Sequence, residues 1–275
     1  MKPNSNPPLS RPQWQLPAGV SRGTWDYVHS DLVADDYDNY FEGNSLFEFD
    51  QRILLETFQK RADRAETIVM DLGCGTGRAL MPFLEAGFHG IAVDLSERML
   101  EIVRDKANHL SVSPEQVQLQ CIRANLVELD CLADHSIDYA MCMFSTLGMI
   151  RGEPARIAML KHVRRILRED GVFIFHIHNF WYNLYDPGGP KWLLKNIWQS
   201  WFDRDLERGD KYFPYRGVNQ MFLHVFSRGE LKRILRKAGF RQLRFIALAV
   251  KRNQPLRLPG CLQSLRANGW IVVCR

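Results

Sequence analysis

Alternating glycines after a short apolar segment constrain this chain more than any other feature. The apolar pattern over 67–72 predicts a buried strand, and the sequence Asp-Leu-Gly-Cys-Gly-Thr-Gly occupies positions 71–77. Glycine has no Cβ, so a loop built this way can turn tightly and lie close to a ligand. A strand that ends in such a loop predicts a ligand site at the carboxyl edge of a sheet.

Strand and helix patterns alternate from this point onward. Apolar segments predict strands over 67–72, 90–93, 117–124, 137–143, 171–178, 240–250 and 270–274. Helices are expected over 78–86, 96–108 and 154–167. Ser227 and Glu230 form a capping-box pattern for a further helix, which Gly239 ends. The alternation predicts an α/β fold, with a doubly wound sheet of parallel strands and helices on both faces.

The remaining segments are expected to attach to this sheet. Residues 1–23 are rich in Pro and predict a flexible tail. Residues 24–65 predict an N-terminal helical cap, in which Ser45 and Glu48 form a capping-box pattern. Residues 66–275 predict the main domain, and the aromatic-rich segment 180–226 is expected as an insert after the fifth strand, on the substrate side.

Composition narrows the class of protein. The six Cys residues form no CxxC pair, so neither a disulfide framework nor a Cys zinc site is expected. No apolar run approaches the ~20 residues of a membrane span, and no apolar signal segment is visible at the N-terminus. We therefore expect a cytoplasmic protein without a transmembrane segment. Charge is uneven, because residues 191–275 carry 18 Lys or Arg against 5 Asp or Glu.

The second predicted strand ends in Asp94, 17 residues after Gly77. A carboxylate at this point can accept hydrogen bonds from both hydroxyls of a ribose. The glycine spacing is G-x-G-x-G, whereas dinucleotide-binding loops have G-x-G-x-x-G. Asp71 adds negative charge beside the loop, which would oppose a pyrophosphate. The pattern favours a nucleoside that carries an ammonium and a sulfonium, as S-adenosyl-L-methionine does.

Two motifs resemble those of the class I S-adenosylmethionine-dependent methyltransferases. Residues 69–77 (VMDLGCGTG) resemble the first motif of that superfamily, and residues 92–96 (AVDLS) resemble its ribose-binding strand end. The resemblance covers roughly residues 66–178, and the order of elements over 227–275 is consistent with it. It implies a Rossmann-like seven-stranded sheet, S-adenosyl-L-methionine as cofactor, and an enzyme that transfers a methyl group.

The resemblance also implies a set of cofactor-binding residues. Asp71 would position the loop and the methionine amino group, Asp94 the ribose, and Leu95 the adenine. Members of the superfamily often have an acid after the third strand, where this chain has Asn125, whose carbonyl oxygen can accept the same hydrogen bond. Asn125 as a turn residue and Leu126 as a core residue remain alternatives. The full set is Asp71, Gly73, Cys74, Gly75, Gly77, Asp94, Leu95, Asn125 and Leu126.

Few residues are candidates for a catalytic role. His176 and His178 share one face of the fifth strand, and His178 lies nearer the carboxyl edge, so it is the preferred base or orienting group. In related methyltransferases a tyrosine of the N-terminal segment often closes over the cofactor, which makes Tyr37 or Tyr40 a candidate. A structural histidine and tyrosines that only pack in the core are the alternatives.

The acceptor is expected to be a small or lipid-like molecule that is methylated on N or O. Residues 143–147 (MFSTL) lack the motifs of DNA amino-methyltransferases and of protein arginine methyltransferases, and no metal-ligand cluster stands out. One alternative is an RNA-directed methyltransferase that uses the basic helix over 228–237, although nucleic acid is not the favoured partner. A nicotinamide-dependent dehydrogenase and a cofactor sensor without turnover are further alternatives. No oligomeric state follows from the sequence.

Overall fold

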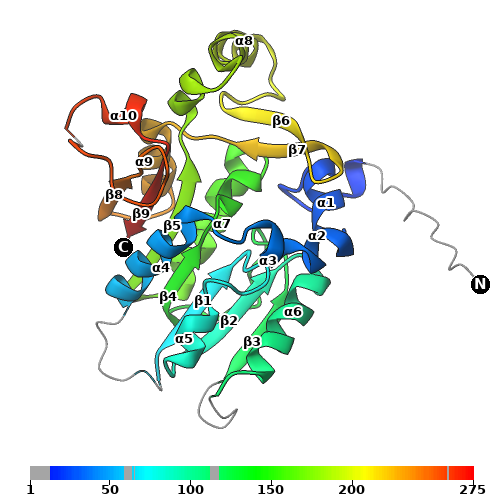
Figure 1. Ribbon diagram of the computed structural model, residues 1–275, viewed down its shortest axis with the longest axis vertical. Coiled ribbons are helices and arrows are strands. Elements are labelled where there is room, and N and C mark those ends of the chain that lie inside the picture. Colours follow the sequence, from blue (N-terminus) through cyan, green and yellow to red (C-terminus); the bar gives the residue numbers. More distant parts are fainter. Residues whose placement is uncertain (1–12, 59–63, 65, 112–117, 259) are drawn as a thin grey trace, which may run out of the picture.

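The computed structural model describes residues 13–58, 64, 66–111, 118–258 and 260–275. Seven strands form one sheet in the order β3-β2-β1-β4-β5-β9-β8 (Figure 1). They are β1 (Ile68–Leu72), β2 (His89–Asp94), β3 (Leu119–Arg123), β4 (Ile137–Cys142), β5 (Leu167–His178), β8 (Leu243–Ala247) and β9 (Gly269–Cys274). The predicted seven-stranded, Rossmann-like sheet is confirmed. β1 pairs with both β2 and β4, so the strand order reverses beside the glycine loop.

The expectation of parallel strands is wrong for one of them. β9 runs antiparallel to both of its neighbours, β5 and β8. Between β8 and β9 the described residues include only α10 (Gln263–Arg266), a helix of four residues, and no crossover helix returns the chain to the other edge. A direct return of this kind gives antiparallel pairing, whereas parallel pairing needs a crossover connection.

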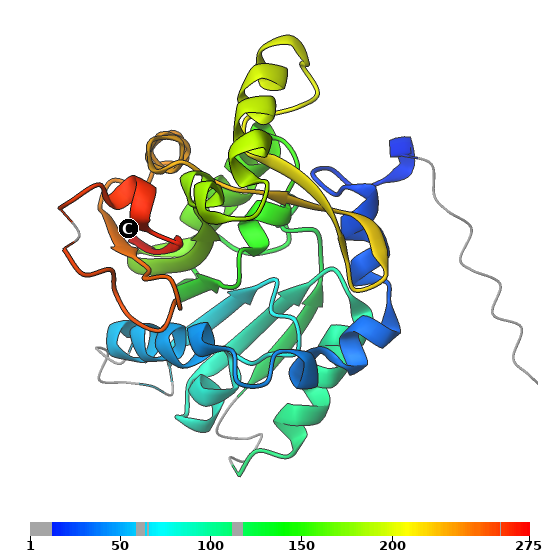
Figure 2. The ribbon, with the colours of Figure 1, turned by 45° about the horizontal axis from the view of Figure 1, so that its top comes forward.

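Helices cover both faces of the sheet (Figure 2). α4 (Ser45–Phe58), α5 (Met81–Glu85) and α6 (Glu97–Asn108) pack on one face, where their apolar residues share a core with Val69 of β1. α7 (Glu153–Ile166) and α9 (Arg228–Lys237) pack on the other face, with Met70 of β1. Successive residues of a strand point to opposite faces, which is why one apolar strand supplies both cores.

Local capping signals explain where several helices begin. Ser96 accepts a hydrogen bond from the Met99 N–H at the start of α6, and Ser227 with Glu230 forms the predicted capping box of α9. The prediction for Ser45 is wrong. Asn44 Oδ1 instead accepts the Leu46 N–H at 3.1 Å, and the Ser45 hydroxyl donates to the Lys251 carbonyl at 2.5 Å. Asn is as good a cap as Ser, and a tertiary partner draws the hydroxyl away.

Regular structure in the N-terminal segment begins at a lower residue number than the sequence predicts. Residues 1–12 of the expected tail lie outside the described part of the chain. Residues 13–23 include η1 (Gln13–Gln15), a bridge from Val20 to Ile150, and the start of α1 (Arg22–Val28), which Ser21 caps. The expectation of a flexible tail therefore does not hold for residues 13–23. α2 (Asp31–Asp35) and α3 (Tyr37–Tyr40) follow and lead toward the glycine loop.

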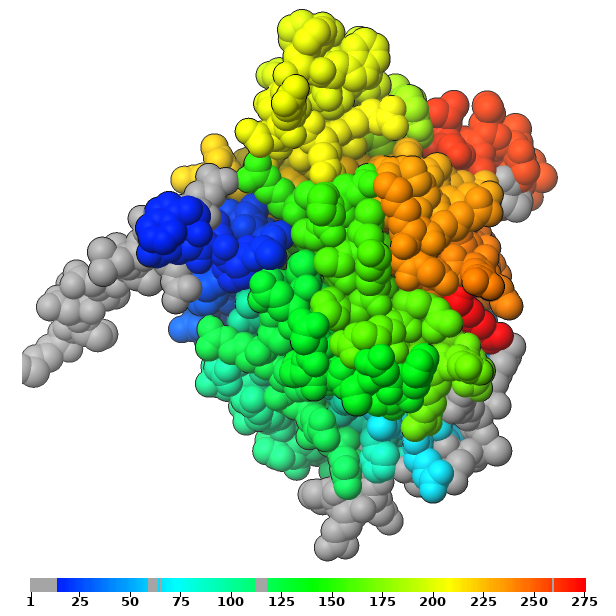
Figure 3. Space-filling model, turned by 180° about the vertical axis from the view of Figure 1, so that it is seen from behind, coloured from blue at the N-terminus to red at the C-terminus, as the bar shows by residue number. Residues whose placement is uncertain are grey.

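The segment between β5 and α9 contains η3 (Phe180–Tyr185), α8 (Gly189–Phe202) and a hairpin of β6 (Asp210–Tyr215) and β7 (Val218–His224). α8 projects from the body of the molecule, and the hairpin reaches across to α1 (Figures 1 and 3). A Cβ on Gly23 would lie 1.9 Å from the Gln220 carbonyl oxygen, so only glycine lets α1 lie this close to β7. In the described residues, no helix combines the length and the apolar character that crossing a membrane requires.

A network of buried charges joins the hairpin to α7 and α9. The buried Arg156 forms an ion pair with Glu207 and donates to the Ile150 carbonyl at 3.0 Å. His224 lies between Asp210 at 2.7 Å and Glu230 at 2.8 Å. Burial alone would lower the pKa of His224, but the hydrogen bonds to both carboxylates outweigh it and raise the pKa.

The same network contains three side chains of metal-ligand type, which the sequence analysis did not single out. Ligand atoms of Glu207, Asp210 and His224 lie within 4.8 Å of one another. Both ring nitrogens of His224 already face carboxylates, and the Arg156 guanidinium supplies positive charge at the same place. The cluster therefore has a structural role that needs no metal ion.

Arg156→Ala is expected to lower the free energy of unfolding by about 3–5 kcal/mol, because it leaves the partly buried carboxylates of Glu207 and Glu230 without this counter-charge. Lys161→Ala, on the exposed side of the same helix, should change it by no more than about 0.5 kcal/mol. Urea denaturation followed by tryptophan fluorescence measures both variants. Similar small effects of the two substitutions would contradict the stabilising role of the network.

Candidate active site

A cavity of about 340 Å³ lies at the carboxyl edge of the sheet, under α1 and the β6–β7 hairpin. We call it the cofactor cavity. Of the predicted cofactor-binding residues, Gly77 alone does not line it. A Cβ on Gly77 would lie 2.9 Å from Met81 Cε, so this glycine lets the loop pack against α5. The predicted residues that line the cavity are Asp71, Gly73, Cys74, Gly75, Asp94, Leu95, Asn125, Leu126, His178 and Tyr37.

The glycine loop has the backbone that its sequence predicts. Gly73 and Gly75 have φ angles of +70° and +52°, in the left-handed region that favours glycine. The Gly73 N–H donates to the Val93 carbonyl at 2.7 Å, which ties the loop to β2. A Cβ on Gly75 would meet only the Tyr37 ring, at 3.9 Å. The loop therefore leaves a cradle beside Gly75 that a ligand can approach closely.

Asp94 connects the glycine loop to the helix that follows β2. Its carboxylate accepts the Gly75 N–H at 2.9 Å through Oδ2 and the Ser96 N–H at 2.9 Å through Oδ1. Burial raises the pKa of Asp94, and these backbone hydrogen bonds oppose the rise. A carboxylate oxygen can accept more than one hydrogen bond, so both oxygens remain available to ligand hydroxyls.

Asp71 differs from Asp94 because no group in the described residues donates a hydrogen bond to its carboxylate. It is only 2% exposed, at the end of β1, and it lines the cavity. Burial raises the pKa of Asp71 to about 7, while Arg78 opposes the rise and the charges of Asp94 and Asp50 add to it. A buried carboxylate without a donor, aimed at a cavity, is suited to a cationic ligand group.

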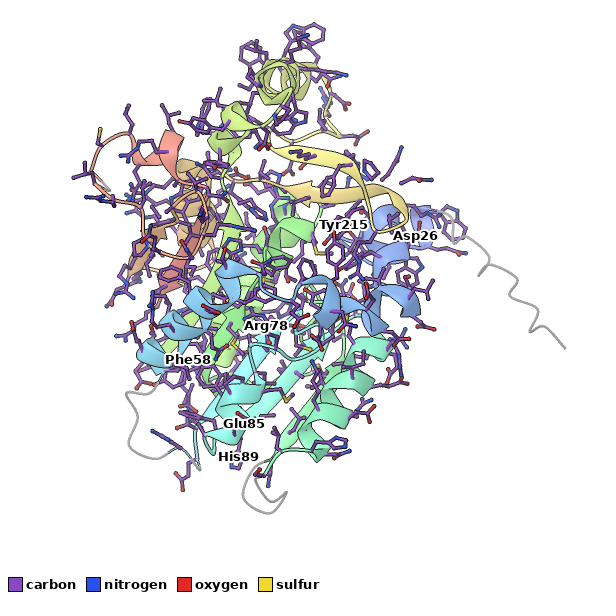
Figure 4. All side chains as sticks on the ribbon, in the orientation of Figure 1. Asp26, Phe58, Arg78, Glu85, His89 and Tyr215 are labelled. Carbon is purple, nitrogen blue, oxygen red and sulfur yellow. The ribbon has the colours of Figure 1, made fainter. Side chains whose placement is uncertain are left out.

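Two ion pairs hold the neighbouring elements around the loop. Lys106 lies 2.5 Å from Asp38 and donates to the Thr76 carbonyl at 3.0 Å, while the Thr76 hydroxyl donates to Asp38 at 2.6 Å. These contacts fasten α3, and with it Tyr37, to the loop. Arg78, labelled in Figure 4 near α4, donates two hydrogen bonds of 2.9 Å to the buried Asp50.

Asn125 follows β3 and lies at the cavity wall. Its amide nitrogen donates to the Ala18 carbonyl at 3.0 Å, and its Oδ1 accepts the Val127 N–H at 3.3 Å. The second contact is that of a turn residue, as the alternative interpretation expected. Oδ1 keeps a second lone pair for a ligand. Leu126 lines the cavity and also belongs to the core around α7.

The segment after β4 is part of the site, and the sequence analysis missed it. Phe144 and Ser145 have φ angles of +53° and +68°, a strained conformation for residues other than glycine. The Ser145 hydroxyl lies in the cavity wall, is buried, and has no hydrogen-bond partner in the described residues. The sequence could have indicated this segment by its position alone, because β4 runs parallel to β1 and ends at the same edge of the sheet.

Of the candidate catalytic residues, two line the cofactor cavity and two do not. His178 lines the cofactor cavity, whereas His176 is buried away from it, with the two rings 5.2 Å apart. Burial, together with the charges of Arg252 and Lys211, lowers the pKa of His178 to about 4. Burial also raises the pKa of Tyr37, so its phenol stays protonated and can donate a hydrogen bond. Tyr40 is 53% exposed and faces Arg216 instead of the cavity.

The aromatic insert contributes to the cavity only through its hairpin. Phe213, Tyr215 and Phe222 line the cavity, and Figure 4 shows Tyr215 beside the N-terminal helices. Trp198 and Trp201 of α8 are 61% and 74% exposed. Of residues 180–226, only the β6–β7 hairpin therefore lines this cavity, and α8 does not.

Comparison with known proteins adds independent information. Residues 69–171 match a family described as "Methyltransferase domain". A protein of Geobacillus sp. (strain WCH70), named as a candidate methyltransferase, is 30% identical over 111 residues, which are 40% of this chain and 42% of that protein. The chain spans 42% to 57% of the length of the curated relatives that it matches.

Solved structures share the fold at low sequence identity. An S-adenosylmethionine-dependent methyltransferase from Methanosarcina mazei has a TM-score of 0.58 and 17% identity, covering 80% of this chain and 95% of the other. The 1,6-didemethyltoxoflavin-N1-methyltransferase of Burkholderia thailandensis has a TM-score of 0.57 and 18% identity, covering 94% and 92%. Together with the strand order, these likenesses show that the chain has the fold of the S-adenosylmethionine-dependent methyltransferases, and that its residues 69–171 match a methyltransferase domain.

Proposed function

We propose that the protein is a methyltransferase that uses S-adenosyl-L-methionine to methylate N or O of a small-molecule or lipid-like acceptor. One observation carries the proposal. The Asp71 carboxylate is buried, lacks a hydrogen-bond donor in the described residues, and lines the cavity beside the open cradle at Gly75. This combination suits a nucleoside with an attached ammonium and opposes one with a pyrophosphate.

The residues present fit this cofactor. Asp71 would pair with its amino group, Asp94 would accept its ribose hydroxyls, and Leu95 with Asn125 would contact the adenine. When bound, the cofactor supplies a methyl group whose carbon–sulfur bond breaks as the acceptor nitrogen or oxygen bonds to the carbon. The protein then has to align the acceptor, which can lower the barrier by about 7–11 kcal/mol.

His178 is the residue that would take the proton from the acceptor. At neutral pH its imidazole is neutral, because burial and two nearby cations lower its pKa to about 4. A neutral imidazole can accept a hydrogen bond and then a proton from an N–H or O–H group. The phenol of Tyr37, whose ring lies beside Gly75, would donate a hydrogen bond to the bound ligand.

The walls of the cofactor cavity favour a small or apolar acceptor. Phe213, Tyr215 and Phe222 come from the hairpin that lies over it. Apolar walls with a few polar groups are typical of small-molecule sites and also exclude water. The Burkholderia neighbour, which is named for methylation of a small molecule at N1, supports an acceptor of this size.

The alternatives are less well supported. In the basic helix that an RNA-directed enzyme would use, Arg233 and Lys237 both pair with Glu153, so part of its charge is already neutralised. The charge of Asp71 disfavours a nicotinamide dinucleotide. A sensor without turnover would share the cofactor site but would not need His178.

S-adenosylhomocysteine, which keeps the amino group, is expected to bind the protein more tightly as the pH rises. The bound ammonium favours the ionised form of Asp71, so below pH 7 binding must release a proton from this group. Affinity should fall about tenfold per pH unit below pH 7 and level off above it. Calorimetric titration between pH 5.5 and 8.5, with NADH as the control ligand, measures the profile.

Asp71→Asn should weaken the binding of S-adenosylhomocysteine at pH 8 and remove the pH dependence of its affinity below pH 7. The variant should also be as stable as the wild type or more so at pH 8. Burial raises the pKa of folded Asp71 to about 7, so the folded state keeps a proton that the unfolded state loses near 3.8, and stability falls as the pH rises through that window. NADH binding without S-adenosylhomocysteine binding would overturn the proposed function.

His178→Ala is expected to reduce turnover about 10²- to 10⁴-fold, the range of general base catalysis, once an acceptor has been found by screening. Affinity for S-adenosylhomocysteine should stay within about twofold. His109→Ala, at the exposed end of α6, is the matched control and should leave both quantities unchanged. Turnover of His178→Ala at the wild-type rate would make this histidine a structural residue.

A further inference from the structure

A second cavity lies beside the cofactor cavity and shares part of its wall. It has a volume of about 510 Å³, and His178, Phe213 and Leu223 line both cavities. An acceptor that fills the second cavity can therefore reach the side chain that we propose as the base. We call it the basic cavity after three of its lining residues, Lys211, Lys251 and Arg252.

The charge of the basic cavity is only partly balanced. The Lys211 ammonium donates to Asn183 Oδ1 at 2.9 Å and lies 3.9 Å from Asp186, the single acidic residue in the lining. The Arg252 guanidinium is half-buried, and it has neither a carboxylate nor a hydrogen-bond acceptor as partner in the described residues. Burial accordingly lowers the pKa of Arg252.

Arg252 differs from three other sheltered arginines among the described residues. Arginines that lie in the interior usually have their charge paired, because an isolated cation is costly to remove from water. Here Arg78 pairs with Asp50, Arg156 with Glu207, and Arg216 with Asp36. Arg252 lacks such a partner in the described residues and lines a cavity, so its guanidinium is available to an anionic ligand.

The loop that carries Arg252 is held in place. Its N–H donates to the Ala249 carbonyl at 2.9 Å, and a bridge joins Leu248 to Pro255. The Ser45 hydroxyl and the Asn268 amide donate to carbonyls of the same loop, which lies close to α4 (Figure 2). A guanidinium held on a fixed loop loses little freedom when it binds a carboxylate or phosphate, and its fork matches both groups.

We infer that the methyl acceptor carries an oxyanion, a carboxylate or a phosphate, that binds to Arg252 in the basic cavity while its nucleophilic atom lies at His178. This inference rests on the proposed methyltransferase function and narrows its acceptor to anionic small molecules. Lys211 and Lys251 add to the attraction, and the apolar Phe213 and Leu223 separate the charged end from the reacting end.

The test uses the full chain saturated with S-adenosylhomocysteine. Calorimetric titrations with benzoate, benzamide and inorganic phosphate compare a carboxylate, its neutral counterpart and a phosphate. Benzoate or phosphate should bind, and benzamide should bind at least about tenfold more weakly. Tighter phosphate binding would identify a phosphorylated acceptor, and tighter benzoate binding a carboxylated one.

Arg252→Ala should weaken oxyanion binding about 10- to 100-fold, the size expected of a hydrogen bond to a charged group. Arg244→Ala removes the same charge from the exposed side of β8 and is the matched control. NMR of histidine-labelled protein gives a second readout, since an oxyanion at Arg252 should raise the pKa of His178 from about 4 in the wild type but not in Arg252→Ala.

The outcomes distinguish a failure of the oxyanion inference from a failure of the proposed methyltransferase function. Equal affinities for benzoate and benzamide, or equal losses in Arg252→Ala and Arg244→Ala, would overturn the inference while S-adenosylhomocysteine still binds. Failure of the wild type to bind S-adenosylhomocysteine would instead overturn the proposed function. Unchanged S-adenosylhomocysteine affinity in Arg252→Ala shows that the variant is folded.

Discussion

The two hydrogen bonds that the Asp94 carboxylate accepts hold the whole site together. Gly75 donates from the loop after β1, and Ser96 donates from the helix start after β2, so one side chain fixes two connections at the carboxyl edge. This contact fixes the glycine cradle relative to the N-terminus of α6, and the hydrogen bonds from Gly73 to Val93 and from Lys106 to Thr76 support it. Substitution of Asp94 by Ala would therefore disturb the loop as well as any ribose contact.

Sheltered charges in the described residues fall into two groups, those paired with an opposite charge and those without such a partner. Arg78 and Asp50, like Arg156 and Glu207, neutralise each other inside the protein and stabilise the packing of α4 and of the hairpin. Asp71 and Arg252 lack such partners in the described residues, and each lines a cavity. A charge left uncompensated lowers stability, so the position of both groups next to a cavity supports the proposal that they serve a ligand.

The insert between β5 and α9 connects the two cavities. Its hairpin lies over the cofactor cavity through Phe213 and Phe222, while Lys211 and η3 form a wall of the basic cavity. The buried cluster around His224 and Arg156 fixes the base of this hairpin to the sheet-covering helices. The segment thus positions cavity-lining residues on a fixed support, whereas its exposed helix α8 lines neither cavity.

Short-range patterns made much of the fold and of the cavity lining predictable. The period of the strands, the glycines at 73–77, Asp94 at a strand end and the capping box at Ser227 each depend on neighbours within a few residues. The antiparallel β9, the choice of Asn44 over Ser45 as a cap, and the strained Ser145 depend on contacts between distant segments. None of these contacts leaves a mark in the local sequence.

The sequence by itself determined the order of strands and helices, the glycine loop and the acidic residues around it, because backbone preferences and apolar periodicity act locally. Only the tertiary structure decided which charges find partners. Arg156 and Arg252 look alike in the sequence, yet one lies beside Glu207 and the other lines a cavity without a counter-charge in the described residues. An ion pair forms only where two opposite charges lie close together in space, and the folding of the chain sets the distance between them.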